Sequence, residues 1–178
     1  VHDALFQELT VGEQIGMVEG RPRYNRDRKG FSSVTDITNT DQNYSYSITA
    51  QLQRQFADRW DASIAYTYGE SWDVTSTTSS QAFSNWRYNP IDADPNNPKL
   101  RPSNFDVRHR IVAQGSYELN LLPNSPTHIS LIYVGESGRP YSYTYASSDI
   151  NGDGSRDNDL IFVPASPDQI RFDGTPEQ

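Results

Sequence analysis

Apolar and polar side chains alternate along residues 104–121. One set of alternate positions is mostly apolar: Phe105, Val107, His109, Ile111, Ala113, Gly115, Tyr117, Leu119 and Leu121. The other set is mostly polar, with Val112 as the exception: Asp106, Arg108, Arg110, Gln114, Ser116, Glu118 and Asn120. A period of two is typical of a β-strand whose faces meet different surroundings. Strands of globular proteins usually have about five or six residues, so a strand of this length indicates a special setting.

Two further segments, 44–56 and 60–69, alternate in the same way. Their mainly apolar positions are Tyr44, Tyr46, Ile48, Ala50, Leu52, Arg54 and Phe56, and then Trp60, Ala62, Ile64, Tyr66 and Tyr68. Because residues 57–59 alone join them, the pair predicts an antiparallel hairpin. A fourth strand is predicted from Thr127. The alternation resumes over 141–145, a fifth strand is predicted to begin at 160–163, and a weaker pattern predicts a strand over 31–37.

The connections between these strands are alternately short and long. Short turns are expected at 57–59 and 122–126, and long loops at roughly 1–30, 70–104 and 146–158. Outer-membrane barrels combine short periplasmic turns and long extracellular loops with aromatic girdles at both interfaces. Phe56 and Trp60 flank one short turn, and tyrosines occupy the opposite strand ends. We therefore predict an all-β chain, an antiparallel meander of long strands that forms a partial, transmembrane β-barrel domain over 1–178.

A soluble β-sandwich with one buried face is the alternative. It would be an extracellular, calcium-stabilised adhesion or carbohydrate-binding module, with its tyrosines as a ligand platform. Six apolar residues distinguish the two folds: Ile48, Leu52, Ile64, Ile111, Leu119 and Leu131. In a barrel segment they lie on one uncovered face, whereas in a sandwich a second sheet buries them.

Composition removes several other classes of protein. Only 34% of the 178 residues are hydrophobic, and no run approaches the roughly 20 apolar residues of a membrane-spanning helix. The net charge is −8, and the basic cluster at 21–29 is interleaved with Asp27, so nucleic-acid binding is not expected. The absence of cysteine excludes disulfides and thiolate metal sites.

Two features of the chain bear on its completeness. No signal-peptide pattern follows Val1. Four or five strands cannot close a barrel, because the smallest barrels of this kind have eight strands. We therefore expect a piece of a larger barrel.

Several short motifs carry a family resemblance in their order along the chain. They are PSNFDVRHRIV at 102–112, SGRPYSY at 137–143, DINGDG at 149–154 and NDLIFVP at 158–164, with Asn39-Thr40 ahead of Tyr44-Ser45. Together they resemble the TonB-dependent outer-membrane receptors, in the group with a carboxypeptidase-regulatory-like domain before the plug. The resemblance covers roughly residues 20–172.

The resemblance implies the C-terminal part of a barrel of about 22 strands in the outer membrane of a Gram-negative bacterium. The implied partners are outer-membrane lipid, the remainder of the barrel and the plug. The TonB complex would be contacted through N-terminal parts that have no match here. The implied function is energised uptake of a ligand, such as a metal chelate, a glycan or a peptide.

The segment 149–159 is the clearest candidate for a metal site. Calcium takes six to eight oxygen ligands, and a loop with carboxylates or amides at positions 1, 3 and 5 and glycine at 6 curls around one ion. The predicted ligands are Asp149, Asn151, Asp153, Ser155 (through its carbonyl), Asp157 and Asp159. Leu160 stands where an EF-hand has glutamate, so a strand-borne calcium loop with a structural ion is predicted. The alternative is an Asx/Gly turn with solvated carboxylates.

Other polar residues give weaker signals. His109 has no metal partner at ligand spacing, so it is expected to pack structurally. Asp106, Arg108, Arg110 and Glu118 share the polar face of their segment and are expected to form ion pairs in the barrel lumen, with a substrate role as the alternative. The chain has no Gly-x-Ser-x-Gly elbow, His-Glu-x-x-His or phosphate loop, so no enzymatic activity is expected.

Overall fold

The structure, a computed structural model, describes residues 3–18, 20–26, 30–56, 59–92, 94–122 and 125–169. The chain divides into two compact units. The sheet unit comprises residues 1–5, 38–78 and 99–141. The loop unit comprises residues 6–37, 79–98 and 142–178. Each unit is described by itself below.

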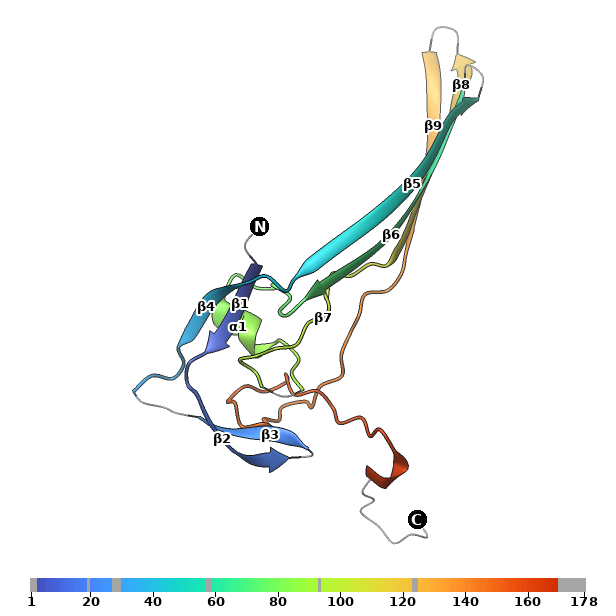
Figure 1. The fold of residues 1–178 in the computed structure, drawn as a ribbon. Coiled ribbons are helices and arrows are strands. Elements are labelled where there is room, and N and C mark those ends of the chain that lie inside the picture. Colours follow the sequence, from blue (N-terminus) through green and yellow to red (C-terminus); the bar gives the residue numbers. More distant parts are fainter. Residues whose placement is uncertain are drawn as a thin grey trace. The chain divides into compact units, whose positions relative to one another are not determined.

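Long antiparallel strands make up the sheet unit (Figure 1). In spatial order they are β5 (Tyr44–Phe56), β6 (Trp60–Asp73), β8 (His109–Leu122) and β9 (Ser125–Glu136), and β7 (Arg101–Pro102) pairs with the end of β6. The turn residues 57–58 and 123–124 lie outside the described residues. The prediction of an all-β, antiparallel meander of long strands is therefore confirmed.

The strand register aligns the apolar positions of neighbouring strands. Leu52 is opposite Ile64, Ile64 is opposite Ala113, and Ala113 is opposite Tyr133. Because successive side chains of a strand point to opposite faces, this register collects the apolar set on one face and the glutamines, serines and threonines of β5 and β6 on the other.

The apolar face is open. Leu52 and Leu131 are each 75% exposed, Ile48 is 70% exposed, and Ile64 and Ile111 are also exposed. Leu119 is half-buried. Within the described residues of the sheet unit, these exposed side chains do not pack against a second sheet. The sandwich alternative is wrong, because it requires these same side chains to be buried against such a sheet.

The strand predicted over 104–121 begins later than its pattern indicates, at His109. The residues before it form a turn, in which the Asp106 N–H donates to the Ser103 carbonyl at 2.9 Å. The buried Asp106 carboxylate accepts the Ser71 N–H at 2.9 Å. Asp106 therefore fixes this turn to the end of β6, which continues past the predicted position 69 to Asp73.

The prediction of a long loop over 1–30 is wrong. This segment contains β1 (Asp3–Glu8), β2 (Val11–Val18) and β3 (Arg21–Arg26). β2 and β3 form a hairpin whose register shifts between Val11 and Gly16. Such irregularities interrupt the period of two, so alternation could not reveal the hairpin. β1 pairs with β4 (Thr35–Thr40), which replaces the strand expected over 31–37.

The alternation that resumes over 141–145 does not form a strand, and the strand predicted to begin at 160–163 is wrong. They reduce to two isolated bridges, Thr144 with Leu160 and Ile91 with Asp159. The loop unit also contains the short helix α1 (Ala82–Arg87) and the 3₁₀ turn η1 (Pro167–Gln169). None of the described helices has the length and apolar character needed to cross a membrane.

Candidate functional site

Aromatic rings frame the apolar face of the sheet unit at both ends. Next to the turn between β5 and β6, Trp60 contacts Tyr117 with ring centroids 5.0 Å apart. At the opposite end, Tyr44 stacks on Trp72 at 6.3 Å. The exposed apolar residues lie between these two aromatic zones. An apolar band with aromatic edges is the surface that a membrane-spanning barrel presents to lipid.

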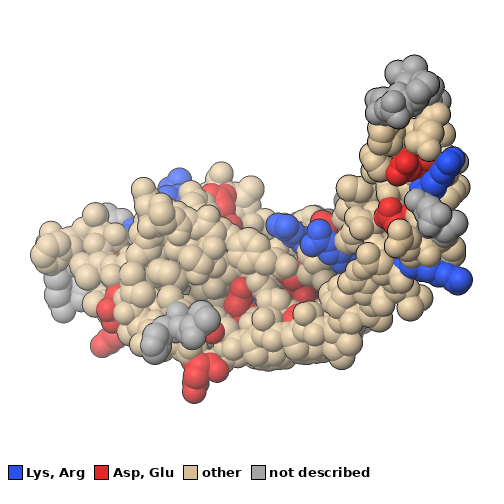
Figure 2. Space-filling model, turned by 90° about the horizontal axis from the view of Figure 1, so that it is seen from above, with Lys and Arg blue, Asp and Glu red and all other residues tan. Residues whose placement is uncertain are grey.

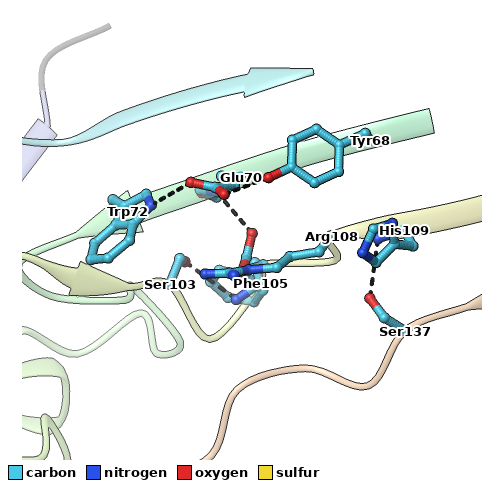
Figure 3. Close-up of polar contacts among 10 residues, drawn as sticks. Tyr68, Glu70, Trp72, Ser103, Phe105, Arg108, His109 and Ser137 are labelled. Carbon is cyan, nitrogen blue, oxygen red and sulfur yellow. Dashed lines mark hydrogen bonds and ion pairs between the residues drawn. The ribbon is translucent and has the colours of Figure 1, made fainter. Parts of the chain in front are cut away.

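A polar cluster lies on the same face near Trp72 (Figure 3). The Glu70 carboxylate accepts hydrogen bonds from the Tyr68 hydroxyl at 2.6 Å and the Trp72 indole N–H at 3.2 Å. Aromatic residues with polar tips suit a membrane–water interface, where one end is apolar and the other is hydrated. These bonds let a carboxylate lie among the aromatic rings at the edge of the apolar band.

His109 and the charged residues near it have structural partners. The Tyr66 hydroxyl lies 2.8 Å from His109 Nδ1, and the His109 N–H donates to Ser137 Oγ at 3.2 Å. Arg108 Nε lies 3.3 Å from Asp106 Oδ2, so two of the four residues predicted for lumen ion pairs are paired with each other, before β8 begins. The other two have charged or titratable cross-strand neighbours: Arg110 is opposite Glu136, and Glu118 is opposite His128.

The loop unit holds the 149–159 segment through a chain of side-chain-to-backbone hydrogen bonds. Asp149 accepts the N–H groups of Gly152 at 2.7 Å and Gly154 at 3.0 Å. Both glycines have positive φ, 78° and 88°, which glycine adopts at little steric cost. Asp157 accepts the Ser147 N–H at 2.6 Å, and Asp159 accepts the Ile150 N–H at 2.7 Å. Two other side chains of the segment form Asx turns, because Asn151 and Asp153 each accept the N–H two residues ahead, that of Asp153 and that of Ser155.

Asp153 is the centre of this segment. Its side chain is fully buried, and its Oδ2 accepts hydrogen bonds from Asn151 Nδ2 at 3.0 Å and Asn158 Nδ2 at 3.1 Å. Its Oδ1 accepts the Ser155 N–H at 2.6 Å. Burial raises the pKa of Asp153, and burial raises the pKa of Asp159 to about 6. Both shifts have the expected cause, because a low-dielectric surrounding disfavours the charged form.

The same segment packs against distant parts of the loop unit. The Tyr24 N–H donates to the Asn151 carbonyl at 2.6 Å, and the Ile91 N–H donates to the Asn158 carbonyl at 2.8 Å. Ser155 Oγ donates to the Arg87 carbonyl at 2.9 Å. The 149–159 segment is thus fixed to β3, to the end of α1 and to the strand-like residue Ile91, rather than standing free in solvent.

Comparison with protein families gives a match over most of the chain. The family model of the outer membrane beta barrel domain matches residues 7–175. The chain belongs to the outer membrane β-barrel domain family. This family places the chain in the bacterial outer membrane. Comparisons with curated proteins and with solved structures gave no match.

Family membership gives the open sheet of this barrel chain a physical explanation. A barrel domain presents an apolar outer face, and its interior is polar. Both faces are present in the sheet unit, in the register predicted by the alternation. In Figure 2 acidic (red) and basic (blue) side chains are scattered over the visible face, several of them next to one another, with tan surface between.

The six predicted metal ligands of this barrel chain are not equivalent. Asn151, Asp153, Ser155 and Asp159 are buried, whereas Asp149 and Asp157 are exposed. The described part of the chain contains no group of three or more acidic, histidine or cysteine side chains placed to hold a metal ion. The calcium prediction therefore stays a prediction. The sequence did not single out Asn158, whose buried side-chain amide donates to Asp153; its only sequence signal was its place between two aspartates.

Proposed function

We propose that this chain is part of the barrel of a TonB-dependent outer-membrane receptor and serves energised ligand uptake. The observation that carries the proposal is the sheet of long strands with an uncovered apolar face, in a chain of the outer membrane β-barrel family. The ordered motifs at 102–112, 137–143, 149–154 and 158–164 support the receptor group. The chain supplies barrel wall and loops, and it performs no catalysis.

The proposal assigns partners to each exposed part of the sheet unit. The apolar face contacts outer-membrane lipid. Within the described residues β5 pairs only with β6, and β9 pairs only with β8. Because unpaired backbone groups are not tolerated in hydrocarbon, these two edges pair with the remaining strands of the barrel. The polar face meets the lumen and the plug, and TonB is contacted through parts of the receptor outside this chain.

Binding of TonB tests the receptor assignment. The complete protein, folded in detergent, is passed over the immobilised periplasmic domain of TonB, with a porin of similar size as the control. The expected result is retention of the protein and not of the porin. Equal elution of both proteins would contradict the receptor assignment and leave the barrel family untouched.

A further inference from the structure

Hydrogen-bond donors gather at one end of the apolar face, beside the turn between β5 and β6. This end, the turn rim, comprises Arg54, Phe56, Trp60 and Tyr117. Arg54 is the only charged residue of β5, yet it lies in the apolar register of that strand. Arg54 and Trp60 are both exposed, and among the described residues neither the guanidinium nor the indole N–H has a hydrogen-bond acceptor. The turn rim therefore presents positive charge and donors to whatever surrounds the sheet.

The opposite rim of the same face has an acceptor of its own. There the Trp72 indole N–H donates to the Glu70 carboxylate at 3.2 Å. At the turn rim the described residues supply no carboxylate on the apolar face. Asp61 belongs to the opposite face, where its carboxylate accepts the Ser116 hydroxyl. Because an unpaired cation is costly in hydrocarbon, an anion from the surroundings of the sheet is the partner that the turn rim suits.

The Arg54 guanidinium is directed toward the membrane interface. Its Cζ lies 4.9 Å from the centroid of the Phe56 ring, which belongs to the strand residue next to the turn. Two residues span about 7 Å along a strand, or about 5 Å along the membrane normal at a tilt of about 40°. Arginine covers such distances by snorkelling, with its stem in hydrocarbon and its charge at the interface. Phosphate is the anion of lipid headgroups there, and arginine can bind it through two parallel N–H groups.

Two open hollows on the apolar face meet at Arg54 and Phe56. The first extends to Trp60 at the turn rim. The second extends away from the turn over the small residues Ala62 and Ala113, and most of its lining residues belong to the apolar register. The first hollow contains the donors and suits a headgroup, whereas the second suits an acyl chain. Arg54 lies where the polar and apolar parts of one lipid molecule would join.

We propose that the turn rim binds one anionic glycerophospholipid. Its phosphate accepts hydrogen bonds from Arg54 and from the Trp60 indole. One acyl chain lies over Ala62 and Ala113. A headgroup with net negative charge, such as phosphatidylglycerol, matches a cation that has no carboxylate beside it among the described residues, whereas the cationic group of a zwitterionic lipid gains no acidic partner there.

The position of the site assigns the lipid to one leaflet. Short turns of outer-membrane barrels are periplasmic, so the turn rim lies in the periplasmic leaflet. The site rests on the proposed contact between the apolar face and lipid. It does not depend on the TonB assignment, because it requires only a barrel wall in a membrane.

The experiment uses the complete protein in phosphatidylcholine vesicles that carry a trace of lipid with a photoreactive diazirine in one acyl chain. The trace lipid is phosphatidylglycerol in one sample and phosphatidylcholine in the other, and mass spectrometry locates the labelled residues. Labelling at Ala62 and Ala113 is expected to be about fivefold higher with phosphatidylglycerol, since one basic residue near an anionic headgroup contributes about that factor to binding.

Two results would overturn the site, and they are distinguishable. Equal labelling by the two lipids would exclude the anionic site and leave the contact between the apolar face and lipid intact. Absence of labelling by both lipids would refute that contact as well. Neither result bears on the retention of the complete protein by TonB.

Matched variants locate the phosphate. Arg54→Gln should abolish the preference for phosphatidylglycerol, while labelling by phosphatidylcholine persists because the apolar hollow remains. Arg54→Lys keeps the charge and should keep a preference. Arg110→Gln removes the same charge from the polar face, where Arg110 is opposite Glu136, and should leave the preference unchanged. A preference that persists in Arg54→Gln, that vanishes in Arg54→Lys, or that falls equally in Arg110→Gln would contradict the assignment of the phosphate to Arg54.

Discussion

The orientation of the sheet in the membrane predicts a large penalty for a charge at Leu52. Leu52 is four residues from Phe56, at the aromatic edge beside the β5–β6 turn. At about 3.4 Å per residue this is about 14 Å along the strand. A strand tilt of about 40° reduces it to roughly 10 Å along the membrane normal, in an apolar band about 25 Å tall. Leu52 therefore lies within a few ångströms of the midplane.

The expected cost of Leu52→Arg is about 2–4 kcal/mol, the value for arginine on the lipid face near the midplane. Lost packing contributes little, because the Leu52 side chain is 75% exposed within the chain. If the same face met water, the substitution would stay within about 0.5 kcal/mol, as is usual for exposed sites. The free-energy cost of Leu52→Arg is therefore several-fold larger if this face meets lipid than if it meets water.

The assay is a urea titration of the complete protein in lipid vesicles, followed by tryptophan fluorescence, with Gln53→Arg as the control. Gln53 lies at nearly the same depth, and it belongs to the opposite, polar face. Its substitution should cost less than about 1 kcal/mol, because a charge in the lumen remains hydrated. A neutral Leu52→Arg, or equal losses in the two variants, would refute the assignment of this face to lipid.

Three further substitutions test local features. Gly152→Ala should speed tryptic cleavage after Arg156, in the 149–159 segment, several-fold. The reason is that φ of Gly152 is 78° and the new Cβ would meet the Tyr24 carbonyl oxygen. The control, Gly138→Ala, should leave the cleavage rate unchanged, because Gly138 has open space around it. Asp106→Ala should lower the free energy of unfolding by about 1–3 kcal/mol in the urea assay, because the Ser71 N–H loses its acceptor. The control is Asp41→Ala, at an exposed residue. Equal losses in the two variants would contradict the role of Asp106. Glu8→Gln should weaken the hydrogen-exchange protection of the Val34 amide. The reason is that the fully buried Glu8 carboxylate accepts the Val34 N–H at 2.6 Å and the Thr35 hydroxyl at 3.1 Å. Unchanged protection of Val34 would contradict this role of Glu8.

The long strands were predictable because their information is local. β5 was predicted with its observed bounds, Tyr44–Phe56, and the facing sets of β5, β6 and β8 follow from a period of two that a one-residue slip would reverse. The helix α1 was not predictable in this way. It has only six residues, and its N-cap residue, Gln81, makes no side-chain capping bond, so it shows too little of the 3.6-residue period.

The candidate metal site was only partly predictable. The spacing of oxygen-bearing residues singled out the 149–159 segment, but not which of them are buried. That depends on contacts with residues far away in the sequence, such as Tyr24 with Asn151 and Ser155 with Arg87. Asn158 could not be singled out from the sequence for the same reason, because its burial and its hydrogen bond to Asp153 arise only in the folded segment.

By itself, the sequence determined the strand pattern of this protein, the two faces of its sheet and the polar loop that interrupts it, because side-chain alternation and turn residues act over neighbouring positions. It could not distinguish a face covered by a second sheet from one left open, since both produce the same alternation. Only the tertiary structure decided that question, by leaving Leu52 and Leu131 uncovered. The bulged hairpin of β2 and β3 and the Asp106 turn were decided there as well, because their hydrogen bonds join residues whose pairing no local period encodes.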